Sequence, residues 1–140
     1  MISLPLSMKY WSSPARPTST SLPPPTGVAG FTEYRTVGLE TLEAAYLADA
    51  ASPQAKVDEL VAFLRDEPIE GRSGAEGAVN SIQGNRAQVE VRVLGVASDS
   101  HAGFDYRLYL LQEGPGGPWK VVAAEVRDLC SRAYDGSVCV

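Results

Sequence analysis

Residues 78–93 read AVNSIQGNRAQVEVRV, and this stretch decides the fold of the chain. Valines at positions 89, 91 and 93 alternate with polar residues at positions 88, 90 and 92. A period of two is typical of an antiparallel strand that buries one face and turns the other to solvent. Residues 78–83 form a short candidate strand upstream, and the intervening Gly84-Asn85 pair tolerates positive φ in a tight turn. The stretch therefore predicts a β-hairpin.

Two further strands follow this hairpin. The alternation returns over residues 104–110 and again over 119–129, and the Gly- and Pro-rich residues 114–118 between them predict a turn. A turn is also expected at residues 98–103, which would leave His101 exposed. The polar positions of the strands carry charges of alternating sign: Glu90, Arg92, Asp105, Arg107, Glu125 and Arg127. We expect these charges to pair across neighbouring strands on a solvent face. Each pair should contribute little to stability, and we assign the pairs no catalytic role.

The residues before the strands have helical spacing. Leu39, Leu42 and Tyr46 lie in an Ala- and Glu-rich window that predicts a helix over residues 37–50. Ser52-Pro53 is a strong start signal for a second helix, because a side-chain oxygen precedes a proline at the first helical position.

Pro68 should end this second helix, and residues 71–77 predict a loop. Four residues form its apolar stripe: Val57, Leu60, Val61 and Leu64. Polar residues occupy the other face: Lys56, Asp58, Glu59 and Arg65. The predicted fold class is α+β, with two N-terminal helices packed on a curved antiparallel sheet of about four strands.

Two regions differ sharply in composition. Residues 1–30 contain six of the ten prolines and no acid, whereas all 17 acidic residues lie in residues 31–140. We interpret 1–30 as a disordered Pro/Ser/Thr-rich tail or tether, and 31–140 as a single domain. A proline-motif ligand at Pro14-Ala15-Arg16-Pro17 is the alternative for the first region. Tyr10-Trp11 would suit the outer edge of a membrane helix encoded upstream, and a plain tail is the other interpretation.

Overall composition excludes several classes of protein. The 140 residues suit one domain, and 44% hydrophobic with 21% charged residues is ordinary for a globular protein. A net charge of −5 argues against a nucleic-acid partner, which would require a basic face. No stretch approaches the ~18 uncharged apolar residues of a membrane span, so none is expected within this chain.

The two cysteines, Cys130 and Cys139, lie near the C-terminal end of the sequence. A loop of this size, closed by a disulfide, gains roughly 2.5–3 kcal/mol on the chain-entropy model. We predict a structural disulfide, which implies an oxidising compartment and an extracytoplasmic location at the cell envelope or outside the cell. A metal site is the rival interpretation. It is disfavoured because there is no third cysteine and the single histidine, His101, is placed in a distant loop.

The order of elements resembles the nuclear transport factor 2-like superfamily, including its ketosteroid isomerase-like and SnoaL-like members. Four stretches within residues 31–130 carry the resemblance: AAYLAD at 44–49, IQGNRAQVEV at 82–91, YRLYL at 106–110 and WKVV at 119–122. The resemblance implies a cone-shaped, cystatin-like fold whose sheet surrounds a pocket. It is strongest to short envelope-anchored members, some of them parts of conjugation or secretion assemblies, which act as scaffolds.

Enzymes of this superfamily suggest two candidate catalytic residues. A first-helix tyrosine donates to the substrate oxyanion and a carboxylate after the second helix takes the proton, which matches Tyr46 and Glu70. The sequence departs from that pattern, because a Gly-rich loop replaces the third helix and no second buried acid accompanies Tyr46.

We therefore expect a non-catalytic extracytoplasmic scaffold domain with protein partners, no cofactor and no metal. The alternative is a ketosteroid isomerase-like enzyme, or a binder of a small apolar ligand in the cone.

Overall fold

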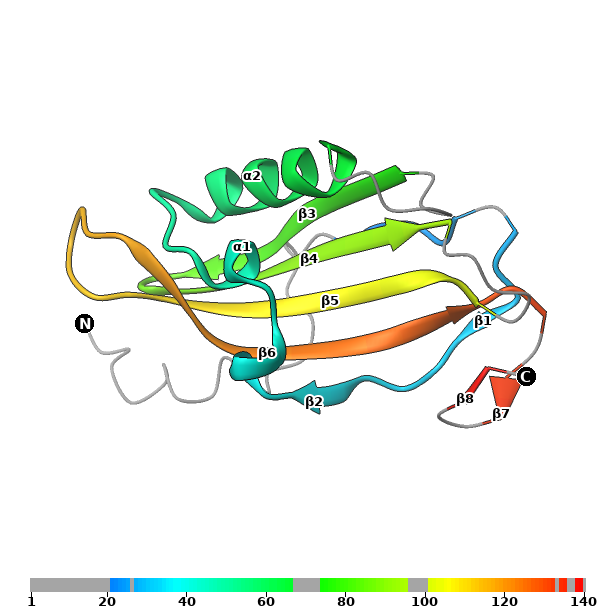
Figure 1. Cartoon of the computed structure of the whole chain (residues 1–140). Coiled ribbons are helices and arrows are strands. Elements are labelled where there is room, and N and C mark those ends of the chain that lie inside the picture. Colours follow the sequence, from blue (N-terminus) through cyan, green and yellow to red (C-terminus); the bar gives the residue numbers. More distant parts are fainter. Residues whose placement is uncertain are drawn as a thin grey trace.

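The computed structural model describes residues 21–25, 27–66, 74–95, 101–132, 134–135 and 138–139. It shows an α+β fold in which a curled antiparallel sheet has its helices on one side (Figure 1). The helical elements are a 3₁₀ turn (Leu39–Thr41), α1 (Ala44–Leu47) and α2 (Pro53–Asp66). The strands are β1 (Gly30–Phe31), β2 (Arg35–Val37), β3 (Gly74–Gln83), β4 (Arg86–Leu94), β5 (His101–Gln112), β6 (Trp119–Cys130), β7 (Tyr134–Asp135) and β8 (Val138–Cys139).

The main sheet has six strands, with β1, β6, β5, β4 and β3 in that order and β2 also paired with β6. All pairings between these strands are antiparallel. The predicted α+β class and the four long strands are confirmed, but the expected total of about four strands is wrong. The additional strands, β1 and β2, cover only two and three residues, too few to show a readable period.

The predicted hairpin is present as β3 and β4, with Gly84 at φ 62° in its turn. The first residues of two strands differ from expectation. β3 begins at Gly74, inside the expected loop, and β5 begins at His101, inside the expected turn. Glycine is required at Gly77 because a Cβ there would lie 2.8 Å from Val57 Cγ1 on α2. Gly77 therefore reflects close packing of α2 on β3 rather than a loop.

Helix α2 begins as predicted. The backbone N–H of Ala55 donates to Ser52 Oγ at 3.0 Å, which is the expected N-cap bond. Leu60 and Leu64 are buried, but so is Lys56, which the helical pattern assigned to the solvent face. Lys56 Nζ donates to the backbone oxygens of Ala45 at 3.1 Å and Ala48 at 2.5 Å. Burial lowers its pKa, and Glu59 and Asp49 oppose that effect.

The first predicted helix, over residues 37–50, is wrong for most of its length. Val37 pairs with Ala124 in the sheet, and Ala50 exchanges two backbone hydrogen bonds with Trp119. Only the 3₁₀ turn and the four residues of α1 are helical between them. Pairing of both ends with β6 outweighs the modest helix propensity of this Ala-rich segment.

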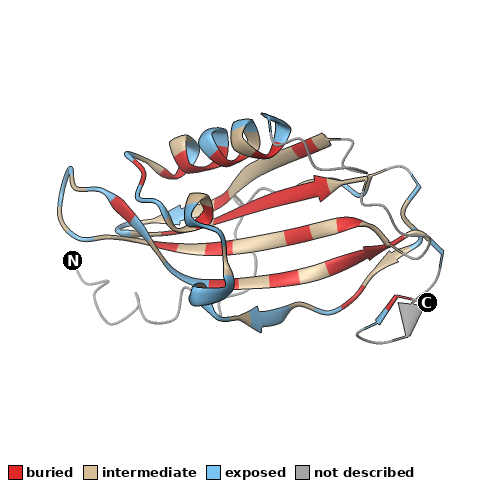
Figure 2. Cartoon of the chain, in the orientation of Figure 1, coloured by how far each residue is buried: buried red, intermediate tan, exposed pale blue. Residues whose placement is uncertain are grey.

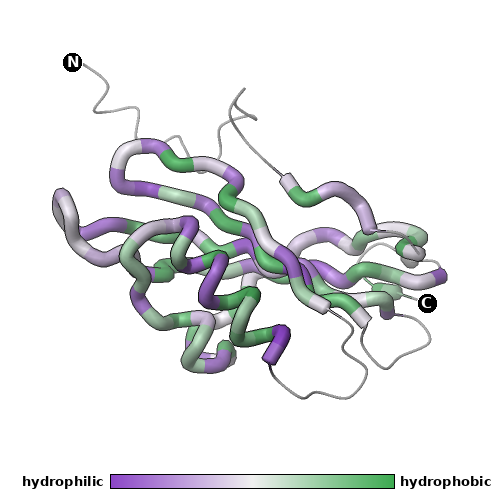
Figure 3. Tube along the Cα trace, turned by 90° about the horizontal axis from the view of Figure 1, so that it is seen from above, coloured by the Kyte–Doolittle hydropathy of each residue, from purple (hydrophilic) through white to green (hydrophobic). Residues whose placement is uncertain are grey.

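The inner face of the sheet, which α2 covers, holds the hydrophobic core (Figures 1 and 2). Val89, Leu108 and Leu110 have no exposed surface, and Trp119 at the start of β6 is also buried in this core. Figure 3 shows hydrophobic and hydrophilic residues alternating along the strands. Among the described residues, no helix is long and apolar enough to cross a lipid bilayer.

Candidate functional site

Tyr46, the first predicted catalytic residue, lies in α1 and is only 5% exposed. Its ring centroid is 4.9 Å from that of Tyr106 on β5, and both rings belong to the core packing. Glu70 lies outside the described residues, so its proximity to Tyr46 stays a prediction. The described geometry therefore assigns Tyr46 a packing role on the inner face.

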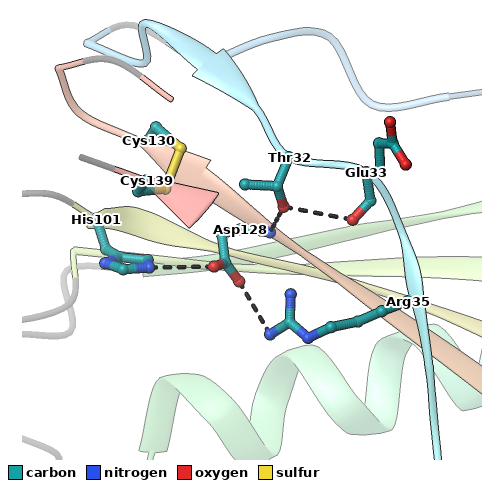
Figure 4. Close-up of a disulfide and its surroundings, with 7 residues drawn as sticks. All are labelled: Thr32, Glu33, Arg35, His101, Asp128, Cys130 and Cys139. Carbon is teal, nitrogen blue, oxygen red and sulfur yellow. Dashed lines mark hydrogen bonds and ion pairs between the residues drawn. A yellow bond between two sulfur atoms is a disulfide. The ribbon is translucent and has the colours of Figure 1, made fainter. Parts of the chain in front are cut away.

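A group of polar side chains shares this inner face at the far end of β6. Asp128 stands opposite Phe104, and Arg35 stands opposite Val126, in the ladders of the sheet. Directly opposite residues project from the same face. Figure 4 shows His101 and Arg35 on either side of the Asp128 carboxylate. His101 Nε2 is 3.2 Å from Asp128 Oδ2, and Arg35 Nη2 donates to Oδ1 at 3.1 Å.

The backbone of Asp128 is held in place as firmly as its carboxylate. Its N–H donates to Thr32 Oγ1 at 2.8 Å, and Thr32 N–H donates to the Asp128 carbonyl oxygen at 2.9 Å. Thr32 is itself buried between β1 and β2. The position of the carboxylate is therefore fixed by main-chain bonds, which suits a binding or acid–base group.

Tyr106 is the next ionisable group along this face. Burial raises its pKa above 10; the charge of Arg35 opposes that shift, while Glu43 and Asp128 add to it. The inner face thus combines a phenol, a carboxylate, an imidazole and a guanidinium at one end. We name His101, Asp128 and Arg35 the end cluster.

The Cys130–Cys139 disulfide is confirmed, with the two Cα atoms 5.2 Å apart. It joins the end of β6 to β8 and lies beside the end cluster (Figure 4). The expectation that His101 is exposed in a distant loop is wrong. His101 opens β5, stands opposite Cys130 in the ladder, and has a side chain 25% exposed. The register of β5 and β6 brings the imidazole of His101, the carboxylate of Asp128 and the sulfur of Cys139 together.

The opposite, outer face of the sheet carries the predicted charges, and they pair across neighbouring strands as expected. Arg92 stands opposite Asp105, and Asp105 opposite Arg127. Asp105 accepts from Arg92 Nε at 2.6 Å, from Arg92 Nη2 at 3.1 Å and from Arg127 Nη2 at 2.9 Å. The expected solvent exposure is wrong, because Arg92 and Asp105 are 0% exposed.

Residues 21–25 are one reason for this burial, and we name them the strap. The N–H of Leu22 donates to Glu90 Oε1 at 3.2 Å, and Arg92 Nη1 donates to the Pro23 carbonyl oxygen at 2.5 Å. Asn80 Nδ2 donates to the same Glu90 oxygen at 2.9 Å. Six residues form what we name the outer-face network: Glu76, Asn80, Glu90, Arg92, Asp105 and Arg127.

Aromatic rings cover the rest of the outer face. The guanidinium carbon of Arg107 lies 3.7 Å from the centre of the Tyr34 ring, and that of Arg127 lies 4.0 Å from the centre of Phe31. Burial raises the pKa of Tyr34 to about 12, against the opposing charge of Arg127. Burial also opposes the charge on Arg92, but Asp105 outweighs this and raises the pKa of Arg92. The outer face is therefore a buried ionic layer.

Three surface hollows lie between described residues, and Tyr46 lines none of them. One, of about 810 Å³, lies between the β3–β4 turn at Gly84 and the β5–β6 turn at Gly114. The others, of about 410 and 330 Å³, flank α2. All three are open at the surface rather than enclosed in the core. Ile82, two residues before Gly84 on β3, is 55% exposed.

Comparison with known proteins finds no matching family model, no significantly similar curated protein and no significantly similar solved structure. Interpretation of the sites described above therefore depends on their geometry alone.

Sequence reasoning missed both the end cluster and the strap. Asp128 lies in the period-two pattern of β6, which places it on the face of Val126, and this signal was present in the sequence. The proline-rich composition of residues 21–25 gave no signal of their contact with Glu90 and Arg92.

Proposed function

We propose that the chain is a non-catalytic interaction domain, acting outside the cytoplasm as a scaffold for protein partners. The observation that carries this proposal is that its own chain covers both faces of the sheet in the described region. α1 and α2 fill the inner face, and the strap with Phe31 and Tyr34 covers the outer face. Such a sheet offers partners its ends and edges rather than an internal cavity.

The disulfide supports the proposed location, since a covalent link between Cys130 and Cys139 is compatible with an oxidising compartment. The strap supports the proposed arrangement on a tether. Its bonds to Glu90 and Arg92 hold residues 21–25 of the expected tail against the outer face.

We expect a partner to contact the end of the sheet at the β3–β4 and β5–β6 turns, because this end carries the hollow at Gly84 and Gly114, and the exposed Ile82 precedes Gly84 by two residues. A photo-cross-linking residue at position 82, in cells that make the full chain, should yield a discrete adduct with another protein. The same residue at position 58, exposed on α2, is the matched control. Equal adducts at both positions, or none at position 82, would contradict the proposal.

The alternative, a ketosteroid isomerase-like enzyme or binder, is favoured by one observation, the Tyr46–Tyr106 pair on the inner face. Such a site would bind an oxyanion mimic such as a substituted phenol through the Tyr46 hydroxyl. We expect no saturable binding in a fluorescence titration of the full chain. Saturable binding that Tyr46→Phe weakens would support the alternative over the scaffold.

A further inference from the structure

The end cluster and the disulfide lie close enough to be one site. A ring nitrogen of His101, a carboxylate oxygen of Asp128 and Cys139 Sγ all lie within 4.8 Å of one another. Imidazole nitrogen, carboxylate oxygen and thiolate sulfur are the three ligand types that Zn²⁺ takes in proteins. In the disulfide, however, Cys139 has no thiolate to offer.

We propose that reduction of the Cys130–Cys139 disulfide creates a Zn²⁺ site whose ligands are His101 Nε2, Asp128 Oδ2 and the Cys139 thiolate. A dithiol reductant supplies two electrons and two protons, the S–S bond breaks, and the reductant leaves as its own disulfide. The Cys139 thiol then loses its proton to solvent as the sulfur–metal bond forms.

The geometry of the two fixed ligands matches the ion. The atoms His101 Nε2 and Asp128 Oδ2 are 3.2 Å apart. Bonds of about 2.0–2.1 Å to a tetrahedral zinc ion require nitrogen and oxygen to be roughly 3.3 Å apart. The metal would replace the proton that these two atoms now share. Arg35 would keep its bond to Oδ1, so the ligating carboxylate has an outer partner that fixes its orientation.

Cys139 is the ligand that must move, and its place in the fold allows this. Cys130 ends the twelve-residue β6, whereas Cys139 lies in the two-residue β8, whose only strand partner in the described part of the chain is β7. On reduction, the sulfur of Cys139 can turn toward His101 and Asp128 while Cys130 stays in the sheet. The disulfide joins β8 to β6, and the metal ion would join β8 to both β5 and β6.

Co²⁺ is the spectroscopic probe for this site, because tetrahedral thiolate ligation produces charge-transfer and visible bands that Zn²⁺ abolishes on displacement. The full chain, reduced with a phosphine, should develop these bands, and the oxidised chain should not. In the reduced chain, His101→Ala should weaken Co²⁺ binding by roughly 100-fold or more, since even loss of an outer-shell partner costs about 10–100-fold. Absence of thiolate bands in the reduced wild type would overturn the proposal.

A matched pair of variants separates ligation from loss of the disulfide. Cys130→Ser and Cys139→Ser each remove the disulfide and leave one thiol, so both should lose the same chain constraint. Under phosphine, Cys130→Ser should keep the thiolate bands and Cys139→Ser should lose them; equal behaviour would overturn the proposal. Circular dichroism checks that each variant is folded. If the reduced protein unfolds without metal, Zn²⁺ must restore the native spectrum, and a spectrum that stays unfolded would also overturn the proposal.

Discussion

The two faces of the sheet are both buried, but by opposite chemistry. On the inner face, Leu108 and its apolar neighbours pack against α2. On the outer face, Asp105 accepts hydrogen bonds from two guanidinium groups, and one of these, that of Arg92, also donates to the strap. An apolar core loses stability gradually as side chains shrink, whereas a buried ionic layer fails when one partner leaves another charge uncompensated. Removal of one charged side chain from the outer face should therefore lower the unfolding free energy more than truncation of one apolar side chain on the inner face.

Asp105→Ala should have the largest effect, because it leaves Arg92 buried without its bidentate partner. Breaking such a pair costs about 3–5 kcal/mol of unfolding free energy, measurable by chemical denaturation. On the inner face, Leu108→Ala should cost about 2–5 kcal/mol and serves as the matched comparison.

The double variant Arg92→Met/Asp105→Leu sharpens this test, since removing both charges should recover much of the loss. The exposed pair of Lys120 with Glu113 is the control, and Glu113→Ala should cost about 1 kcal/mol or less. A loss at Asp105 as small as that at Glu113 would mean that the outer face is solvated.

Removing the disulfide should have the next largest effect. With a metal chelator present, Cys130→Ser should lower the unfolding free energy by about 2.5–3 kcal/mol, because the unfolded chain regains loop freedom. Unfolding followed by tryptophan fluorescence measures this, with reduced wild type as the control. If the variant matched oxidised wild type, the C-terminal link would have no part in stability.

Deleting residues 1–25 tests how much of the outer-face burial depends on the strap. The deletion removes the bonds from Leu22 to Glu90 and from Arg92 to Pro23. Hydrogen bonds to charged groups contribute about 1.5–3 kcal/mol each, and water can replace part of this loss, so we expect a decrease of about 2 kcal/mol. Deletion of residues 1–20 keeps the strap and should leave the unfolding free energy unchanged. Equal stability of the two truncated chains would refute a role for the strap.

Alkaline pH should act on the outer face through Tyr34. The pKa of Tyr34 is about 12 in the folded protein and near 10 in the unfolded chain. The unfolded chain therefore loses this proton first, so stability present below pH 10 should decrease between about pH 10 and 12. Tyr34→Phe should reduce the steepness of that decrease, with Tyr10→Phe in the tail as control. An unchanged slope would show that Tyr34 titrates normally.

The parts of the fold that follow from local pattern were predicted from the sequence, and those that depend on distant pairing were not. Val89, Val91 and Val93 indicate β4 by their period, and Ser52-Pro53 indicates the start of α2 by its capping chemistry. Residues 37–50 have helical spacing, but their ends pair with β6 about 70–90 positions away. Local propensity is too weak to resist such pairing.

The sites show the same division. A cysteine pair at the chain end was sufficient to predict the disulfide. His101 lies close to Asp128 and Cys139 because β5 begins at His101. The sequence pattern predicted that this strand begins at residue 104, which placed His101 in a turn and gave no sign of the cluster. Alternating charges predicted that charged residues pair across neighbouring strands, as Arg92 and Asp105 do, but not that they are buried, because a period of two does not reveal what covers a face.

Exchange of the Arg92 side-chain Nε proton with water tests the central claim, a buried outer face, most directly. In wild-type protein at neutral pH, nuclear magnetic resonance should show a persistent Arg92 Nε–H signal, because this proton is bonded to Asp105 at 2.6 Å away from solvent. The corresponding proton of Arg35, whose side chain is 50% exposed, should exchange much faster. An Arg92 proton that exchanges as fast as that of Arg35 would contradict the account.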